Sequence, residues 1–348
     1  MQKIDVGIIG FGRIGAEHSG WIGQSQHAQV VDVYDATPAR RDLAAARGFT
    51  TNETLEMFLT SSKIDAVLIS VPTSMHFELA IDCLRSGKHV MIEKPMALDL
   101  AQAKAIAEEA TAQNKIVSVF HNRRWDVDFL TVQQAIAAGT FGRVFNVESR
   151  LGQWSSCVGP AVKEYRPNWR NEGTFGGGGL YDWGSHFLDQ LWRLMLPAKP
   201  TTVFAQLRGN VWSADCDDFA RVLINFDNGA VGLCEINTTT TRPLPRWHID
   251  GVEGSAFSPY SLEFDTTFWA SLRFTGKDQE AHVTLPMAEP GLTETQIWDR
   301  FAAAVYGHGE PAVSVKSVLP TMALLDAARE SSLSGKAIDV ANVVEWVL

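Results

Sequence analysis

The chain has no surplus of positive charge, because its 40 acidic side chains outnumber its 30 basic ones. The resulting net charge of -10 disfavours nucleic acid or an anionic membrane as a partner, since both favour basic patches. Long apolar runs are also missing, and the first expected strand begins near Lys3, which leaves no room for a signal peptide. We therefore expect a cytoplasmic protein that binds a small molecule.

Closely spaced cysteines are absent as well. The four cysteines show no spacing typical of a zinc site, a redox motif or a disulfide framework. No cluster of histidine, cysteine and aspartate has the spacing of metal ligands, so we expect no metal. Buried, reduced thiols are the simplest interpretation of Cys83, Cys157, Cys216 and Cys234.

The first 120 or so residues carry the pattern of a parallel sheet. Short β-branched apolar runs alternate there with longer segments rich in Ala, Leu and Glu, as expected for strands joined by helical crossovers. We expect strands at 4–9, 30–34, 66–71, 89–93 and 116–120. The chain is long enough for two domains, so we predict an α/β fold class in which residues 1–122 form a doubly wound Rossmann domain.

The regular alternation ends at residues 121–125, and a period of two follows. Apolar residues alternate over 203–207 and 220–226, and Asp227-Asn228-Gly229 predicts a hairpin turn before a strand at 230–236. Helical patterns occur at 128–138, 293–306 and 319–332. We therefore predict that residues 123–348 form an α+β domain with a large, mainly antiparallel open sheet and helices on one face.

Residues 10–15, with the sequence GFGRIG, lie between the first expected strand and a helix expected at 14–22. Gly10 would allow a tight turn, Gly12 would let the backbone approach a pyrophosphate, and Gly15 would let the helix pack close to the sheet. Asp35 ends the second expected strand, where a carboxylate would accept the ribose hydroxyls of adenosine. The pattern predicts a dinucleotide site, and a plain strand-to-helix turn is the alternative.

Asp35 also bears on the choice of cofactor. A carboxylate at this position repels a 2′-phosphate and so favours NAD over NADP. Arg40 and Arg41 leave NADP open, because they could hold that phosphate if Asp35 turned away. We expect NAD, with NADP as the alternative.

Ligands of doubly wound sheets bind at the carboxyl ends of the strands, where residues 71–76 and Glu93-Lys94-Pro95 are expected. Lys94, placed before a proline, can point its ammonium into the cleft and bond to substrate hydroxyls. His76 by itself is more typical of a local cap or of packing. The predicted cofactor-binding residues are Gly10, Phe11, Gly12, Arg13, Ile14, Gly15, Asp35, Pro72, Thr73, His76, Glu93 and Lys94.

A second glycine run, at 176–179, leads into a segment with helical spacing. Asp182 and His186 stand four residues apart in this segment and would share one helix face. A carboxylate and an imidazole held together are typical of general acid/base catalysis. The alternative is that the glycines permit close packing and that the pair caps or satisfies a helix.

Together these motifs resemble the glucose-fructose oxidoreductase and inositol dehydrogenase (Gfo/Idh/MocA) family. The resemblance rests on GFGRIG, the Pro72/His76 pair, Glu93-Lys94-Pro95 and the stretch from Gly177 to His186. It implies a Rossmann domain followed by an α/β domain whose open sheet usually forms oligomers. Residues 166–170 are most similar to the scyllo-inositol dehydrogenase-like branch, and Asp35 departs from branch members that prefer NADP.

The resemblance also implies roles for single residues: Lys94 contacts substrate and cofactor and often has a cis bond to Pro95, His186 is the acid/base, and Asp182 is its partner. Elementary chemistry supports these roles. A secondary alcohol gives its hydride to a nicotinamide only if its hydroxyl proton leaves to a base, which a neutral histidine can accept. Lys94 would stabilise negative charge on the carbinol oxygen, and Asp182 would hold the tautomer of His186.

Tryptophan and arginine side chains lie close in sequence to these residues. Tryptophan faces suit the C–H faces of a sugar or cyclitol, although Trp is often core or interface. Arg166 and Arg170 could bond sugar hydroxyls or an acidic group, or pair with carboxylates at a subunit contact. The predicted substrate-binding residues are Lys94, Arg123, Trp154, Arg166, Trp169, Asp182 and His186.

The leading hypothesis is an NAD-dependent dehydrogenase of a sugar, sugar derivative or inositol, forming a homo-oligomer, a dimer or tetramer, through its second-domain sheet. One rival with the same fold is a glycosidase that keeps NAD bound and uses transient oxidation to eliminate the aglycone. Another is a nucleotide-sensing regulator without catalysis. The joint presence of Lys94, Asp182 and His186 disfavours the regulator.

Overall fold

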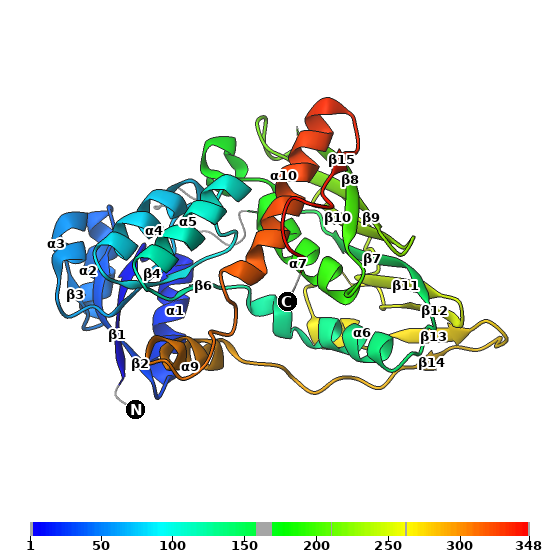
Figure 1. The fold of residues 1–348 in the computed structure, drawn as a ribbon, viewed down its shortest axis with the longest axis horizontal. Helices are drawn as coiled ribbons and strands as arrows, with labels where there is room; N and C mark the ends of the chain where they lie inside the picture. The colour runs from blue at the N-terminus through cyan, green and yellow to red at the C-terminus, as the bar shows by residue number, and fades with distance from the viewer. Residues whose placement is uncertain (1–2, 158–168, 210, 262, 347–348) are drawn as a thin grey trace.

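Two β-sheets form the framework of the protein, and helices cover them (Figure 1). The computed structural model describes residues 3–157, 169–209, 211–261 and 263–346. Within these ranges no helix is both long and apolar enough to cross a membrane.

The first sheet confirms the predicted doubly wound domain, because its six parallel strands have the order β3-β2-β1-β4-β5-β6. Its strands are β1 (Ile4–Ile9), β2 (Ala28–Tyr34), β3 (Thr50–Thr51), β4 (Ala66–Ile69), β5 (His89–Ile92) and β6 (Val117–Val119). Its helices are α1 (Arg13–Gln24), α2 (Pro38–Ala46), α3 (Leu55–Thr60), α4 (His76–Arg85) and α5 (Leu100–Ala112). The sequence did not predict β3, because two residues are too few to show a period.

The second sheet has nine strands in the order β14-β13-β12-β11-β7-β10-β9-β8-β15. Its strands are β7 (Val144–Gly152), β8 (Pro200–Arg208), β9 (Phe219–Phe226), β10 (Val231–Asn237), β11 (Trp247–Gly251), β12 (Gly254–Phe257), β13 (Arg273–Gly276), β14 (Val283–Thr284) and β15 (Ile338–Asp339). Strands β7 and β10 pair in parallel, whereas the other neighbours are antiparallel. The large, mainly antiparallel sheet is therefore confirmed.

Helices cover one face of this second sheet. The helices of this part are α6 (Val127–Ala137), α7 (Ser185–Leu194), the short α8 (Thr266–Trp269) and α10 (Leu319–Ser334). Helices α7 and α10 pack directly on its strands. On β9, Val222 and Ile224 are buried, whereas Arg221 and Leu223, which alternate with them, are exposed. Among the described residues, one face of β9 is thus buried and the other exposed, as the period of two predicted.

Helix α9 (Glu294–Val305) lies against α1 of the first sheet, on the side away from α10 (Figure 1). Ile297, Trp298 and Phe301 join the buried cluster formed by β1 and β2. The division into residues 1–122 and 123–348 stays a prediction, and α9 is an exception to it. By packing, this helix belongs with the first sheet.

Replacing Phe301 by alanine is expected to lower the free energy of unfolding by about 3–5 kcal/mol, because a large, fully buried side chain is lost from the α9 contact. The matched control is Leu333→Ala near the end of α10, where the side chain is 89% exposed. That change should cost less than about 0.5 kcal/mol. Urea denaturation followed by circular dichroism measures both, and equal small losses would contradict the role of α9.

Candidate active site

The glycine loop joins β1 to α1 at the carboxyl end of the first sheet. Gly10 has a left-handed φ of +91°, a conformation that favours glycine. A Cβ on Gly15 would stand 2.0 Å from the carbonyl oxygen of Gly10, so α1 can approach β1 this closely only with glycine there. Gly12 at the N-cap makes no side-chain cap, which leaves the first N–H groups of α1 available to a phosphate. The loop therefore fits a dinucleotide.

Asp35 follows β2 and faces this loop. Its Oδ2 accepts a hydrogen bond from the Phe11 backbone N–H, and its Oδ1 accepts one from the Thr37 backbone N–H, both at 2.8 Å. Arg40 Nη1 lies 3.5 Å from Oδ2, while Arg41 Nη1 donates to the Asp35 carbonyl oxygen at 2.7 Å. The carboxylate does not turn away from the loop, which was the condition for NADP binding by the arginines. This arrangement favours NAD.

His76 belongs to the predicted cofactor-binding set, and the structure gives both of its ring nitrogens contacts within the chain. Its ring is 1% exposed, with Nδ1 2.9 Å from the Pro95 carbonyl oxygen and Nε2 3.0 Å from the Val71 carbonyl oxygen. Burial lowers the pKa of His76, so the neutral ring donates to one of these carbonyls at a time. No polar atom of the ring is left for a cofactor. The side chain instead ties together the segments that follow β4 and β5.

Lys94 follows β5, and its peptide bond to Pro95 is cis, as the resemblance implied. Its Nζ donates to Asp182 Oδ1 and to the Asp182 carbonyl oxygen, both at 2.9 Å. Arg170 Nε donates to the same Oδ1 at 3.4 Å. Burial acts to raise the pKa of Asp182, but Lys94 and Arg170 outweigh it and hold this pKa below its usual value. Asp182 is thus an anion that links the two sheets.

The predicted pair of Asp182 and His186 is not formed. Asp182 lies in a π-helical turn over Leu180–Gly184, and α7 begins after it at Ser185. Asp182 lies where hydrogen bonds join i and i+5, whereas His186 lies in the α-helix that follows, so the two residues belong to different helical segments. Asp182 turns to Lys94, and His186 Nδ1 has no hydrogen-bond partner among the described residues. The spacing of four predicted a pair on one helix face, but Lys94 and Arg170 hold Asp182 instead.

The buried ring of His186 instead makes an edge contact with the ring of His121, with centroids 5.5 Å apart and planes at 88°. Burial, reinforced by the positive charges of Lys94 and Arg123, holds the pKa of His186 well below its usual value. Burial also lowers the pKa of His121 to about 4. Both imidazoles are therefore neutral near pH 7, and His186 is in the form that accepts a proton.

Arg123 lies in the 3-10 turn Asn122–Trp125. Its guanidinium carbon is 4.0 Å from the ring centroid of Phe264 and 5.1 Å from that of Trp183. Its Nη1 donates to Asp126 Oδ2 at 3.2 Å. The predicted substrate contact thus lies against two rings that stack on each other, Trp183 and Phe264, close enough to lower the pKa of His186 by its charge.

The remaining residues predicted to contact the substrate lie in different places. The Trp169 ring lies 4.4 Å from the guanidinium carbon of Arg170, so it borders the group that bonds Asp182. Trp154 is 55% exposed, and its ring contacts Trp212 with centroids 5.3 Å apart rather than the Lys94 cluster. Arg166 lies outside the described residues. Arg170, which the sequence left open between substrate and a carboxylate, pairs with a carboxylate within its own chain.

The second glycine run serves close packing, which was the alternative interpretation. Gly178 has φ +108°, and a Cβ on it would lie 2.3 Å from Asp217 Oδ1. Asp217 Oδ2 accepts a hydrogen bond from the Leu180 backbone N–H at 2.7 Å, at the start of the π turn. Burial raises the pKa of Asp217 to about 7. Sequence reasoning missed Asp217, because only the fold brings it to the glycine run.

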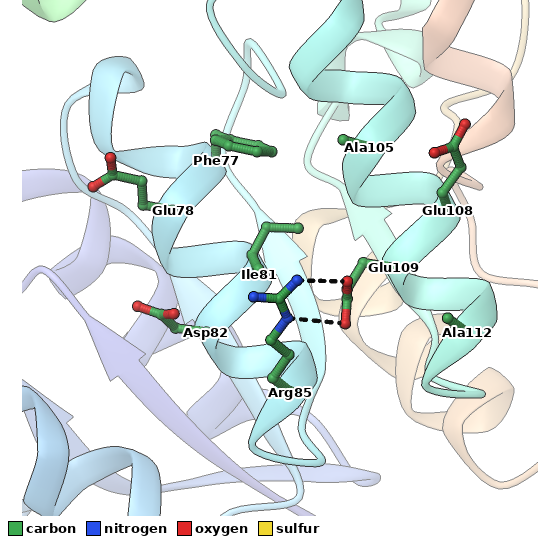
Figure 2. A pocket seen from close by; sticks show the side chains of 9 residues that line it. All are labelled: Phe77, Glu78, Ile81, Asp82, Arg85, Ala105, Glu108, Glu109 and Ala112. Carbon is green, nitrogen blue, oxygen red and sulfur yellow. Dashed lines mark hydrogen bonds and ion pairs between the residues drawn. The ribbon is translucent and has the colours of Figure 1, made fainter.

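A groove between α4 and α5 lies apart from these residues (Figure 2). Arg85 and Glu109 face each other across it as an ion pair of 3.2 Å. The described residues that line it include no predicted site residue. Phe77 and Ile81 lie among carboxylates there: the lining residues are Phe77, Glu78, Ile81, Asp82, Arg85, Ala105, Glu108, Glu109 and Ala112.

The described residues contain no group of three His, Cys, Asp or Glu side chains arranged to hold a metal ion. All four cysteines are unpaired. Cys83 and Cys234 are buried as expected, whereas Cys157 and Cys216 are only partly buried. The expectation of four buried thiols is therefore correct for two of them.

Comparison with known proteins identifies the family. Residues 4–121 match "Oxidoreductase family, NAD-binding Rossmann fold", and residues 129–257 match the "GFO/IDH/MocA C-terminal domain". A solved NAD-binding protein from Listeria innocua is 30% identical, with 98% of each chain covered and a TM-score of 0.86. The chain belongs to the Gfo/Idh/MocA oxidoreductase family, whose NAD-binding Rossmann fold it carries.

The curated relatives either are less identical to this chain than the Listeria innocua protein or match a smaller part of it. The uncharacterized oxidoreductase YdgJ of Escherichia coli is 35% identical over 62% of this chain, but only 60% of its own length is covered. The scyllo-inositol 2-dehydrogenase (NADP(+)) IolW of Bacillus subtilis is 27% identical over 76% of this chain and 70% of its own length. The Bordetella pertussis WlbA dehydrogenase, solved with NADH and UDP-GlcNAcA, shares the fold at 24% identity and a TM-score of 0.80, with 97% of this chain and 99% of that chain covered.

Asp217→Asn is expected to become more stable relative to the unchanged protein as the pH rises from 5 to 8. A carboxyl whose pKa is raised from 3.8 to about 7 favours folding fully below its unfolded pKa, and this contribution is lost as the pH rises through 7. Asparagine keeps an acceptor oxygen for Leu180 but does not ionise. Between pH 5 and pH 8, the unfolding free energy of Asp217→Asn should therefore rise by roughly 1–3 kcal/mol relative to that of the unchanged protein. Urea denaturation at both pH values tests this, and a constant difference would contradict it.

Proposed function

We propose that the protein is a dehydrogenase that oxidises a secondary alcohol of a sugar, sugar derivative or inositol with NAD, or catalyses the reverse reduction. The observation that carries the proposal is the contact of Lys94 with Asp182, at the carboxyl ends of the strands of the first sheet. Relatives named scyllo-inositol 2-dehydrogenase (NADP(+)) and inositol 2-dehydrogenase support this substrate class. NADP, the alternative to NAD, is less favoured because the Asp35 carboxylate faces the glycine loop.

The first sheet supplies the groups that would hold the cofactor. The backbone of residues 10–15 and the N-terminus of α1 would bind the pyrophosphate, and Asp35 would accept the ribose hydroxyls. When bound, NAD takes up a hydride from the substrate carbon or returns it in the reduction. The predicted contacts of Pro72, Thr73 and Glu93 with the cofactor are part of this proposal.

His186 would accept the proton of the substrate hydroxyl. Its low pKa keeps the ring neutral at neutral pH, and this is the form that a general base needs. No carboxylate holds its Nδ1 in the described part of the chain. Burial in α7 and the edge contact with His121 would orient the ring instead.

Lys94 would stabilise the negative charge that develops on the carbinol oxygen. An ammonium has three N–H donors, and two of them already reach Asp182. The third remains for the substrate oxygen, in a site where burial strengthens its effect. The role of Asp182 is therefore to aim Lys94, rather than to hold the tautomer of His186 as the sequence suggested.

The uncovered face of the second sheet would join subunits into a homo-oligomer. Leu223 on β9 is 39% exposed there, next to Arg221 on the same strand. The family resemblance supports this use of the sheet. No part of the proposed chemistry depends on it, because Lys94, Asp182 and His186 lie in one chain.

Incubation with a panel of sugars, sugar acids and inositols, with NAD or NADP, tests the proposed function through absorbance of the reduced cofactor. We expect turnover of at least one member and a preference for NAD, because Asp35 would repel a 2′-phosphate. The reverse direction is measured with the corresponding ketoses and oxidised inositols. Absence of turnover in both directions would count against a dehydrogenase, and release of a chromogenic leaving group without net NADH would indicate the glycosidase.

His186→Ala and Lys94→Ala are each expected to lower kcat/KM by roughly 10²–10⁴-fold, since each removes a group that acts on the reacting oxygen. Asp182→Asn should resemble Lys94→Ala, because it removes the anion that aims the ammonium. Isothermal calorimetry should show NAD binding that changes less than about threefold. Arg85→Ala, which breaks an ion pair in the α4–α5 groove, is the control. Normal turnover by either of the first two variants would refute the assignment.

A further inference from the structure

Two buried histidines hold the residues on either side of Lys94. His76 contacts the carbonyl oxygen of Pro95, as described above. His18 of α1 places its Nε2 2.8 Å from Glu93 Oε1, and Glu93 Oε2 accepts the backbone N–H of Lys94 at 3.0 Å. Lys94 is therefore fixed from both directions along the chain, and its side chain is fixed by Asp182.

The tautomer of His18 is set from the far end of the chain. Trp298 of α9 places its Nε1 3.0 Å from His18 Nδ1. An indole N–H can only donate, so Nδ1 must accept and carries no proton. The neutral ring therefore carries its proton on Nε2 and donates it to Glu93.

The surroundings of His18 hold this arrangement in place. The ring is fully buried, and it makes edge contacts with Trp21, Phe120 and Trp298, at centroid distances of 4.8, 4.3 and 5.7 Å. Burial acts to raise the pKa of Glu93, but the hydrogen bond from His18 and the charge of Lys94 outweigh it and lower this pKa. Glu93 thus stays an acceptor for both of its donors.

We propose that the hydrogen-bonded chain Trp298–His18–Glu93 positions Lys94, so that helix α9 is part of the support of the active site. The proposal rests on the role that the proposed function gives to Lys94. Without the indole N–H, the buried Nδ1 of His18 has no donor, and the ring loses one of the two hydrogen bonds that fix its position. The ring can then shift, which weakens its hydrogen bond to Glu93. Glu93 would be held less firmly, and with it the backbone N–H of Lys94.

A matched pair of variants isolates this hydrogen bond. Trp298→Phe and Trp21→Phe each remove an indole N–H from a ring that touches His18. Only Trp298 donates to His18, and Trp21 Nε1 makes no hydrogen bond seen in the described residues. We expect Trp298→Phe to lower kcat about tenfold, as is typical when a partner of a catalytic group is lost, with KM for NAD changed less than about twofold. Trp21→Phe should keep kcat within about twofold.

Two further measurements do not depend on activity. Nitrogen-15 spectra of the histidine rings should show His18 protonated on Nε2 only, with the Nδ1 signal shifted by the hydrogen bond from Trp298, and this shift should be lost in Trp298→Phe. Acetic anhydride should acetylate Lys94 faster in Trp298→Phe than in Trp21→Phe, as followed by mass spectrometry with the exposed Lys277 as internal reference. Both measurements stand even if the substrate panel shows no turnover, so a failure of the proposed function is distinguishable from a failure of this proposal.

Variants of His18 itself complete the test. His18→Leu leaves Glu93 without its donor and can prevent folding, whereas His18→Gln keeps one donor and one acceptor. We expect His18→Gln to keep kcat and Lys94 acetylation closer to the unchanged protein than Trp298→Phe does. Lys94 acetylation equal in Trp298→Phe and Trp21→Phe, or a proton on Nδ1 of His18 in the unchanged protein, would overturn the proposal.

Discussion

The ion pair between Lys94 and Asp182 is the contact on which the site depends, because it joins the strand ends of the first sheet to the glycine segment before α7. Both side chains are only 16% exposed, so each would be costly to leave alone. The pair is supported from both sides. Arg170 adds a second cation to Asp182, and Glu93 holds the backbone of Lys94. The ion pair between Lys94 and Asp182 therefore fixes the position of the glycine segment relative to the first sheet, and with it the geometry of the site.

The backbone of the glycine segment makes the contact between Lys94 and Asp182 possible. Gly178 lets Asp217 approach, and Asp217 bonds the N–H of Leu180 where the π turn starts. Asp182, in the π turn, bonds Lys94. His186 lies in the first turn of α7, and no carboxylate among the described residues bonds its Nδ1. Asp182 and His186 thus contact different groups, although they stand four residues apart. π turns are frequent at functional sites.

Local patterns in the sequence predicted most of the fold. Alternating apolar runs marked five of the six strands of the first sheet, and the motifs GFGRIG and Glu93-Lys94-Pro95 marked the strand ends. What failed depended on partners distant in sequence. Periodicity shows which face of α9 is buried, but not that Phe301 joins the buried cluster of the first sheet rather than that of the second. Spacing paired Asp182 with His186, whereas in the fold the carboxylate of Asp182 bonds Lys94.

The buried histidines show why residue type and burial alone could not assign the site. His18 and His76 have partners for both ring nitrogens, so their rings are held as structural links. His186 is equally buried, but its Nδ1 has no partner in the described residues, and burial together with nearby cations lowers its pKa and keeps the ring neutral. A ring with both nitrogens bonded has no acceptor left for a substrate proton. The capacity for proton transfer therefore follows from the partners a histidine lacks, and these depend on the tertiary fold.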